Sequence, residues 1–439
     1  MRFFLVIMFI VAVVFAQQPD SLTIDKAVDI VLKRHPSITQ AKEALEAARA
    51  HTRGIESANY PTVSADVSDV YLGPEYAFNL GHGSKFTIFP DNNFDAHIGA
   101  MYTLYDFGKR SIALEASKTG EASASDQLQS VKTQLYYQVL QLFTIIILQE
   151  KSVLVTDEGI AELDRHLVDV RKKIEAGGAT EFDELKTQVQ RATAQGQRID
   201  IASDLAKKKA AFRLLLGLKP GAPLDLKGGF DTLSMRLDVD SLVSYAINNR
   251  SERALAADAR QSAKLQREIA KKENLPVLNI HASGGFKNGF PDTMPPPSTD
   301  ISTPRINWSA GAEVSIPLYD GKRAHFHEQE SARNEMASNA ALNTIDERIK
   351  TEVLQAVEDV AASYSKLDIS RAQIAFAQRS LELARLKYDA GVVTNLDVLD
   401  AENDFSQAQL GHLRNQFQYT QSIYELDKAT GRMPVTLPR

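Results

Sequence analysis

The stretch INWSAGAEVSIPLYDGKR, residues 306–323, joins two patterns that together decide the fold. Residues 306–319 alternate strictly, with small or polar side chains facing one way and apolar ones the other. The apolar positions are Ile306, Trp308, Ala310, Ala312, Val314, Ile316 and Leu318. Strands of this length with one apolar face are typical of membrane β-barrels. A half-buried sheet of a soluble protein would alternate similarly and is the alternative interpretation.

Beyond this strand the pattern changes to that of a very long helix. No proline occurs between Pro317 and Pro434, and proline costs about 3 kcal/mol in a helix interior. The segment from Gly321 to Gly391 has no helix breaker, so at 1.5 Å per residue it would span about 100 Å. Apolar residues recur there at spacings of three and four: Leu342, Ile345, Ile349, Val353, Ala356, Val360, Tyr364 and Leu367. An extended coiled coil would share this stripe but would not explain the strand.

The chain repeats itself at an offset of about 214 residues, which indicates an internal duplication. The clearest match aligns Leu104-Tyr105-Asp106-Phe107-Gly108-Lys109-Arg110 with Leu318-Tyr319-Asp320-Gly321-Lys322-Arg323. A second match aligns Ala176-Gly177, Thr180 and Asp183 with Ala390-Gly391, Thr394 and Asp397. A second proline-free stretch, from Pro90 to Pro220, matches the first.

Each repeat is predicted to run helix, two strands, long helix and return helix, a mainly α fold with membrane β-strands. The first repeat covers 17–218, with strands over about 62–72 and 94–105 and helices over 22–59 and 108–217. The second covers 237–432, with strands over about 277–286 and 306–319 and helices over 237–274 and 321–431. A linker at 219–236, in an equatorial region, and a C-terminal tail at 433–439 complete the chain.

Residues 1–16, MRFFLVIMFIVAVVFA, predict a cleaved signal peptide. Their apolar run of about 14 residues is shorter than the roughly 20 that a spanning helix needs, although an uncleaved anchor is the alternative. We expect no later stretch to be long and apolar enough to cross a bilayer as a helix. An exported chain of this kind is either soluble outside the cytoplasm or enters a membrane as β-strands.

Composition excludes several classes of protein. Lys and Arg total 50 against 56 Asp and Glu, a net charge of −6, so the chain lacks the basic character of a nucleic-acid-binding protein. The chain is 44% hydrophobic and 24% charged, close to the average of soluble proteins. It contains no cysteine, which excludes disulfides and thiolate metal sites.

The number of strands predicts an oligomer. Four strands cannot close a barrel, and the smallest outer-membrane barrels have eight. Open sheet edges do not occur in lipid, so several copies must combine. Two copies would give a barrel filled by side chains, whereas three would leave room for a channel, which favours a homotrimer.

The unit is duplicated, and each long helix starts at a Gly-Lys-Arg sequence. The turn of the second repeat reads Tyr388-Asp389-Ala390-Gly391, followed by Thr394-Asn395-Leu396-Asp397-Val398-Leu399-Asp400-Ala401. Together these features resemble the TolC-like outer membrane efflux proteins. The resemblance extends from about Leu22 to Gly431. It implies a homotrimer in which a 12-stranded outer-membrane β-barrel continues into a long periplasmic α-helical barrel. It also implies the exit duct of a tripartite efflux or type I secretion system in a Gram-negative-type cell. Its partners would be a periplasmic adaptor (membrane fusion) protein and an inner-membrane transporter of the RND, ABC or MFS type.

The repeated turns are the candidate gate. Gly177 and Gly391 permit tight turns, and Thr180 and Thr394 lie where the return helices begin. Either Thr394 or Asn395 can cap the second return helix. Asp397 and Asp400 are three residues apart on one helix face, so a threefold axis would stack them into two carboxylate rings that attract cations. Crowding in such rings should raise some of the carboxyl pKa values.

The resemblance implies that this Asp pair forms the constriction at the periplasmic tip. It also implies that residues matching Asp183 and Tyr388 hold the closed state. An arginine that takes part in this lock in the best-known family member is Val393 here. The plainer alternatives are a cap and a solvated acid for the Asp pair, a cap for Asp183, and core packing for Tyr388.

No catalytic, metal or cofactor site is predicted, so the protein is not expected to be an enzyme. His325-Phe326-His327-Glu328 suggests metal binding, but histidines two apart on a helix point to different sides. Gly108-Lys109-Arg110 and Gly321-Lys322-Arg323 lack the upstream glycine of a phosphate-binding loop. The leading hypothesis is a passive duct for drugs, metal ions or polypeptides. A periplasmic coiled-coil adaptor or structural protein without a pore is the alternative.

Overall fold

The computed structural model describes residues 21–74, 77–79, 85–87, 90–230, 237–289 and 301–433. The predicted signal peptide lies outside the described residues, as do 231–236 of the linker and 434–439 of the tail. The described residues form two compact units. The sheet unit comprises 43–126 and 254–344, and the hairpin unit comprises the rest of the described chain.

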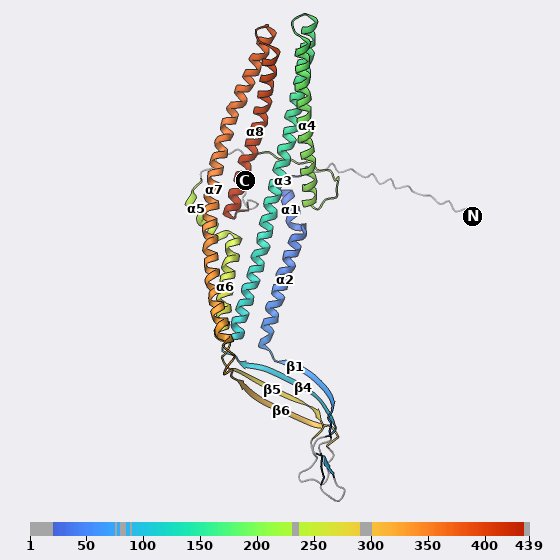
Figure 1. The fold of residues 1–439 in the computed structure, drawn as a ribbon, viewed down its shortest axis with the longest axis vertical. Helices are drawn as coiled ribbons and strands as arrows, with labels where there is room; N and C mark the ends of the chain where they lie inside the picture. The colour runs from blue at the N-terminus through green and yellow to red at the C-terminus, as the bar shows by residue number, and fades with distance from the viewer. Residues whose placement is uncertain are drawn as a thin grey trace, which may run out of the picture. The chain divides into compact units, whose positions relative to one another are not determined.

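One antiparallel sheet dominates the sheet unit (Figure 1). Its strands are β1 (Thr62–Tyr71), β4 (Asn92–Tyr105), β5 (Val277–Lys287) and β6 (Arg305–Ser315), and they lie in that order. The strand pair of the first repeat therefore joins that of the second through β4 and β5. In this sheet β1 and β6 each pair on one side only, so both edges are open.

The register sorts side chains onto two faces. Residues directly opposite one another share a face, and the row Val63, Ala100, Ala282, Ala310 is apolar throughout. The next row, Ser64, Gly99, Ser283, Ser309, is small and polar. The apolar face is exposed in this chain, with Trp308 80% and Ile306 78% accessible. A sheet with one exposed apolar face and one polar face has the pattern of a membrane-barrel wall.

Two strand predictions need correction. Strand β6 ends at Ser315 rather than Tyr319, because Pro317 has no N–H to donate to a sheet ladder. The first repeat, predicted to have two strands, also contains a small hairpin of β2 (Ala77–Asn79) and β3 (Lys85–Thr87) between β1 and β4.

The duplicated Tyr-Asp motif sets the start of each long helix. Asp106 accepts hydrogen bonds from the backbone N–H groups of Gly108 (3.1 Å) and Arg110 (3.0 Å). Asp320 accepts one from the N–H of Ala324 (2.8 Å). These bonds satisfy amide groups that have no partner within the helix. Gly108 and Gly321 have positive φ of 81° and 72°, which explains why glycine recurs at this place in both repeats.

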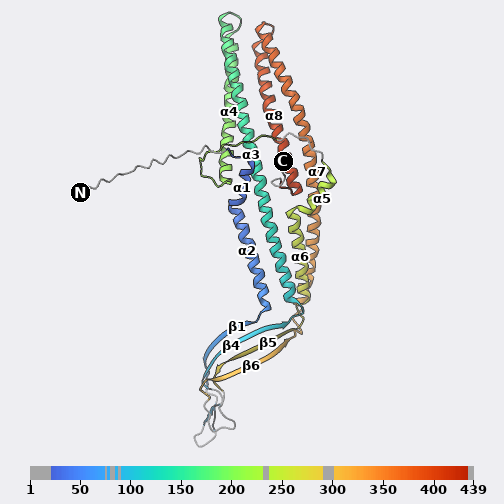
Figure 2. The same cartoon turned by 180° about the vertical axis from the view of Figure 1, so that it is seen from behind.

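Most of two long antiparallel helix pairs lies in the hairpin unit, and the pairs are seen from opposite sides in Figures 1 and 2. The first pair is α3 (Lys109–Glu175) with α4 (Glu181–Leu215), and the second is α7 (Arg323–Asp389) with α8 (Asn395–Thr430). Both α3 and α7 have 67 residues. The predicted apolar stripe of α7 is buried, with Ile349, Val353 and Leu367 fully covered by packing that includes Tyr419 of α8.

We expected no helix after the signal peptide to be long and apolar enough to cross a bilayer. By length and composition alone, this expectation was wrong. Among the described residues α3 contains an 18-residue window with a mean hydropathy of 1.5, long and apolar enough to cross a membrane. Half of that window is buried inside the structure. Side chains such as Val139, Phe143 and Ile146 belong to the packed core of the hairpin unit.

Each opening helix is divided, contrary to the single helices predicted over 22–59 and 237–274. The first gives α1 (Ile24–Arg34) and α2 (Pro36–Glu56), because a proline cannot continue the hydrogen-bond ladder of the preceding turn. The second gives α5 (Val239–Asn249) and α6 (Ser251–Lys271), with extended backbone at Arg250.

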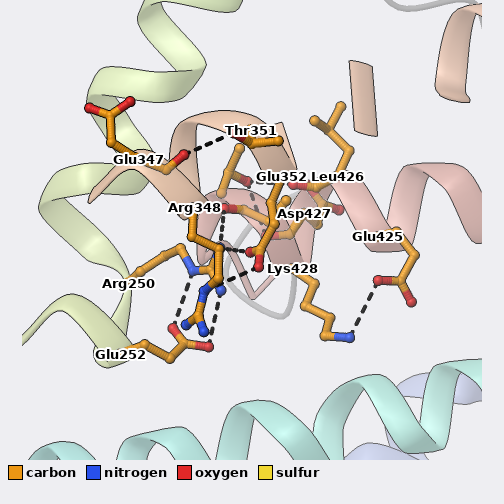
Figure 3. A network of polar contacts seen from close by, with 12 residues as sticks. Arg250, Glu252, Glu347, Arg348, Thr351, Glu352, Glu425, Leu426, Asp427 and Lys428 are labelled. Atoms are coloured by element: carbon orange, nitrogen blue, oxygen red, sulfur yellow. Dashed lines mark hydrogen bonds and ion pairs between the residues drawn. The ribbon is translucent and has the colours of Figure 1, made fainter. Parts of the chain in front are cut away.

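Ion pairs, rather than a proline, accompany the second break. The Arg250 side chain is only 7% exposed and pairs with Glu252 (3.1 Å) and with Glu352 of α7 (Figure 3). Arg348 also approaches Glu352, at 3.5 Å. The two carboxylates counter the desolvation of the guanidinium, whose pKa is raised overall. The break at Arg250 thus places its side chain in a buried network.

Candidate functional site at the hairpin turns

Similar turns close the two hairpins. Gly177 and Gly391 have positive φ of 76° and 71°, a conformation that glycine adopts without strain. Gly178 donates from its backbone to Lys173 O (2.7 Å), and Val392 donates to Lys387 O (2.9 Å). These bonds satisfy carbonyl groups at the ends of α3 and α7, as in a Schellman motif.

A capping box then starts each return helix. The Thr180 side chain accepts from the N–H of Asp183 (3.3 Å), and the Asp183 carboxylate accepts from the Thr180 N–H (2.9 Å). Thr394 and Asp397 make the same reciprocal pair, at 3.4 and 2.7 Å. The cap of α8 is therefore Thr394, and the alternative of Asn395 was wrong.

The capping box stabilises the ionised form of the Asp397 carboxyl. Hydrogen bonds from the hydroxyl and the backbone N–H of Thr394 lower the pKa of this carboxyl below its usual range. Asp397 and Asp400 are both exposed, and they share one side of α8 because they are three residues apart. Within one chain, two acids therefore lie near the turn of the second hairpin.

Asn395 joins the two hairpins. Its side chain is buried at 3% exposure, and its amide donates to Asp183 O (3.0 Å) and to the hydroxyl of Thr187 (3.3 Å) on α4. Its oxygen lies 2.7 Å from Nε2 of His166 on α3. Because the amide oxygen can only accept, His166 must carry a proton on Nε2. This one side chain thus contacts both helices of the first hairpin.

Lys173 makes a second link, from the last turn of α3 to the end of α7. Its ammonium donates to Tyr388 O (3.0 Å) and pairs with Asp389 (3.1 Å). It also lies 3.6 Å from the centroid of the Tyr388 ring, within the range of a cation–π interaction. One cation thus satisfies a carbonyl at the end of α7 and contacts an aromatic face.

Tyr388 is half-buried between these groups. Burial raises the pKa of its hydroxyl, and the carboxylates of Asp183, Asp389 and Asp169 raise it further, so the phenol stays neutral. The hydroxyl is buried and has no hydrogen-bond partner within the part of the chain that the structure describes. No hydrogen bond therefore joins Tyr388 to Asp183, whose carboxylate serves its own capping box.

Arg385 provides a third link, farther from the turns. Its guanidinium pairs with Glu162 on α3 (2.8 Å) and with Glu402 on α8 (3.1 Å). The links together form a cross-hairpin cluster, which we define as Glu162, His166, Lys173, Thr187, Arg385, Tyr388, Asp389 and Asn395. Val393, where the resembling family has an arginine, contributes no charge, whereas Lys173 and Arg385 do.

Sequence reasoning located the turns but missed most of this cluster. Gly177, Gly391, Thr180, Thr394, Asp183 and Asp397 all lie at the two turns. His166, Lys173 and Arg385 were not singled out, because each lies within a polar stretch of a long helix. The repeat could have drawn attention to Asn395, since Glu181 occupies the matching position of the first repeat.

The two histidines of α7 that were considered as metal ligands contact other side chains. His327 pairs with Glu273 (2.8 Å), and His325 contacts Gln329 on its own helix (3.0 Å). No group of three or more His, Cys, Asp or Glu side chains suited to a metal ion is found among the described residues.

The sequence model of the "Outer membrane efflux protein" family matches residues 27–218 and 242–432, once over each repeat. The chain therefore belongs to the outer membrane efflux protein family, whose members are channels for transport. Membership places it in the outer membrane, with a periplasmic portion.

The individual relatives are distant. The cobalt-zinc-cadmium resistance protein CzcC of Cupriavidus metallidurans is 22% identical over 328 residues, which cover 74% of each chain. The outer membrane protein TolC of Salmonella enteritidis is 22% identical over 365 residues, covering 81% of this chain and 72% of TolC. The crystal structure of VceC from Vibrio cholerae superimposes with a TM-score of 0.78 at 17% identity, covering 93% of this chain and 96% of VceC. The fold is thus that of solved outer-membrane channels.

Proposed function

We propose that the protein is a passive exit duct that works as a homotrimer and is gated at its hairpin turns. The observation that carries this proposal is the four-stranded sheet with two open edges and an exposed apolar face. A sheet of this kind is unstable alone in lipid, because the edge N–H and C=O groups of β1 and β6 would have no partners there.

Pairing β6 of one copy with β1 of the next would satisfy both edges. Three copies would close a barrel of twelve strands, wide enough for a channel, whereas eight strands would be filled by their own side chains. The polar row through Ser64 and Ser309 would then line the interior, and the apolar row through Val63 and Ala310 would face lipid.

For the gate, we propose that Asp397 and Asp400 of the three copies surround a narrow opening. Their exposure and their position beside the turn of the second hairpin support this assignment. Two stacked rings of carboxylates would attract cations and repel anions.

The closed state would be held by the cross-hairpin cluster. Moving the second hairpin away from the first would break the contacts of Lys173 and Asn395 together. Breaking them would leave buried polar groups such as Thr187, which is fully buried, without their present partners. Opening would therefore need energy from outside the chain, consistent with docking of a periplasmic adaptor and an inner-membrane transporter.

The cargo is proposed by class only, as drugs, metal ions or polypeptides. CzcC is named for cobalt, zinc and cadmium resistance, and a second relative of 19% identity, PrtF, for the secretion of proteases. The polar row of the sheet offers hydroxyl and small side chains rather than an apolar lining. A wide, polar interior would pass solutes with little selection by binding.

Mass and conductance test the proposal together. The protein purified from outer membranes in detergent should have the mass of three chains by light scattering, and the same sample should conduct in planar bilayers. A protein released by osmotic shock alone, or a monomer without conductance, would support the periplasmic protein without a pore instead.

Replacing Asp400 by asparagine should weaken cation selectivity without closing the channel. The substitution removes one ring of charge but keeps the shape of the side chain, and it leaves the capping box of Thr394 and Asp397 intact. The reversal potential in a salt gradient should move severalfold closer to zero in planar bilayers. Asp359→Asn, which removes an exposed charge from α7, is the matched control and should leave selectivity unchanged. An unchanged reversal potential in Asp400→Asn would refute the aperture assignment.

A further inference from the structure

A cavity lies among the four long helices of the hairpin unit, away from the turns. It has a volume of about 130 Å³ and takes residues from α3, α4, α7 and α8. A cavity of about 150 Å³ lined by apolar groups is large enough to bind benzene. This cavity is slightly smaller, so a single six-membered ring is the upper limit of what it can enclose.

One acid in its wall is incompletely paired. Glu402 of α8 is buried, at 8% exposure. Its Oε1 pairs with Arg385 (3.1 Å), but its Oε2 is buried and has no hydrogen-bond partner among the residues that the structure describes. Leaving a buried carboxylate oxygen without a donor is costly, so Glu402 carries a negative charge that is incompletely compensated within the chain.

The charges around the cavity favour a cation. Glu158, Glu162 and Glu402 line it, and the lining includes a single basic residue, Arg385. Arg385 is shared between Glu162 and Glu402, so one positive charge faces three negative ones. An anion would meet this excess of negative charge, whereas a cation would reduce it.

Part of the wall is apolar. Leu163 and Leu381 are buried at 5% and 7% exposure, and Phe405 completes this side of the cavity. A ligand that combines a flat apolar body with N–H donors would therefore meet both kinds of wall. An amidinium is planar and presents parallel donors, which suits a carboxylate.

We propose that this cavity is a binding site for a small organic cation, an amidinium or ammonium group on a body about the size of benzene. The charged group would lie against the carboxylate of Glu402, and the ring would pack against Leu163, Leu381 and Phe405. Because four helices of both hairpins contribute to the wall, such a ligand would bridge the two hairpins. Glu162 and Arg385 also belong to the cross-hairpin cluster, so the site requires that the two hairpins stay together.

Benzamidine is the probe, and benzamide, its neutral counterpart of the same shape, is the matched control ligand. Calorimetric titration of the purified full-length protein in detergent should show benzamidine binding at least about tenfold more tightly than benzamide, the size expected for a charged hydrogen bond. Glu402→Gln should remove that preference. Glu425→Gln, the same change at an exposed position of α8, should preserve it.

A second variant tests the cavity without touching its charges. Gly159 lines the cavity within α3, and a Cβ there would meet only Ser406 Oγ, at 3.7 Å. Gly159→Leu should therefore fold, fill the cavity and abolish benzamidine binding while Glu402 stays in place. The proposal is overturned if benzamidine does not bind the unmodified protein, or if either Glu402→Gln or Gly159→Leu binds it as tightly.

Discussion

Replacing Ala310 by arginine should remove most of the folded protein from the outer membrane, whereas arginine at the preceding residue, Ser309, should be tolerated. Ala310 lies on the apolar face near the middle of β6, and Ser309 lies on the polar face. An arginine facing lipid near the bilayer midplane costs about 2–4 kcal/mol, and every copy in an assembled barrel would carry that cost. The same side chain at Ser309 would point into the proposed water-filled interior.

The two variants control for each other, because they place the same residue in the same strand one position apart. Ser309→Arg loses only the contact between the hydroxyls of Ser309 and Ser283 (2.9 Å). The amount of unheated, assembled protein in outer-membrane fractions on a gel measures the outcome. Equal loss in both variants, or greater loss in Ser309→Arg, would contradict the assignment of the faces.

Replacing Asp427 by asparagine should stabilise the protein at pH 8 and have little effect at pH 4. Burial raises the pKa of the Asp427 carboxyl to about 6, against only a partial opposing effect of Arg432. Tyr136 and Tyr137 of α3 face it, and burial raises the pKa of both, so they stay neutral. The ionised Asp427 is thus the group that destabilises the folded state here.

The sign follows from the order of ionisation. Near pH 4 and below, the Asp427 carboxyl is largely protonated in the folded state. It is also partly or fully protonated in the unfolded state, so burying it costs little folding stability. Between about pH 4 and 6 the unfolded chain ionises first, so stability falls as the pH rises. Above pH 6 the cost is constant, and at about 1.4 kcal/mol per pKa unit it reaches roughly 3 kcal/mol. Asparagine keeps the shape and removes the charge.

Thermal denaturation in detergent at a fixed scan rate measures this effect. Asp427→Asn should raise the Tm by several degrees at pH 8, and the difference from the unmodified protein should shrink toward pH 4. Glu425→Gln, an exposed change two residues earlier in α8, should give no pH-dependent difference. A difference that is the same at both pH values would show that ionisation of Asp427 is not the cause.

The features readable from sequence were those set by local chemistry. Proline cannot sit inside a helix, so its absence between Pro90 and Pro220 revealed the first long hairpin. Side-chain alternation has period two in any strand, so it located the long strands to within a few residues. Pro36 and Pro317 were visible signals for the end of a helix and of a strand, and giving them more weight would have corrected both boundaries.

The features that could not be predicted depend on distant parts of the chain. The break at Arg250 has no proline, and its guanidinium is paired by Glu352, a residue far along the sequence. Lys173 and Asn395 gain their roles only when two hairpins from different repeats lie side by side. Thr394 was recognised as a possible cap because a capping box is confined to four consecutive residues.

The open edges of the sheet also have a genetic consequence. If β1 of each chain must pair with β6 of a neighbour, no copy can complete its barrel without intact partners. A chain with a defective edge strand would then prevent barrel closure in every trimer that contains it. When half of the chains are defective and mix at random, only about one trimer in eight is free of them, so such mutations should be dominant.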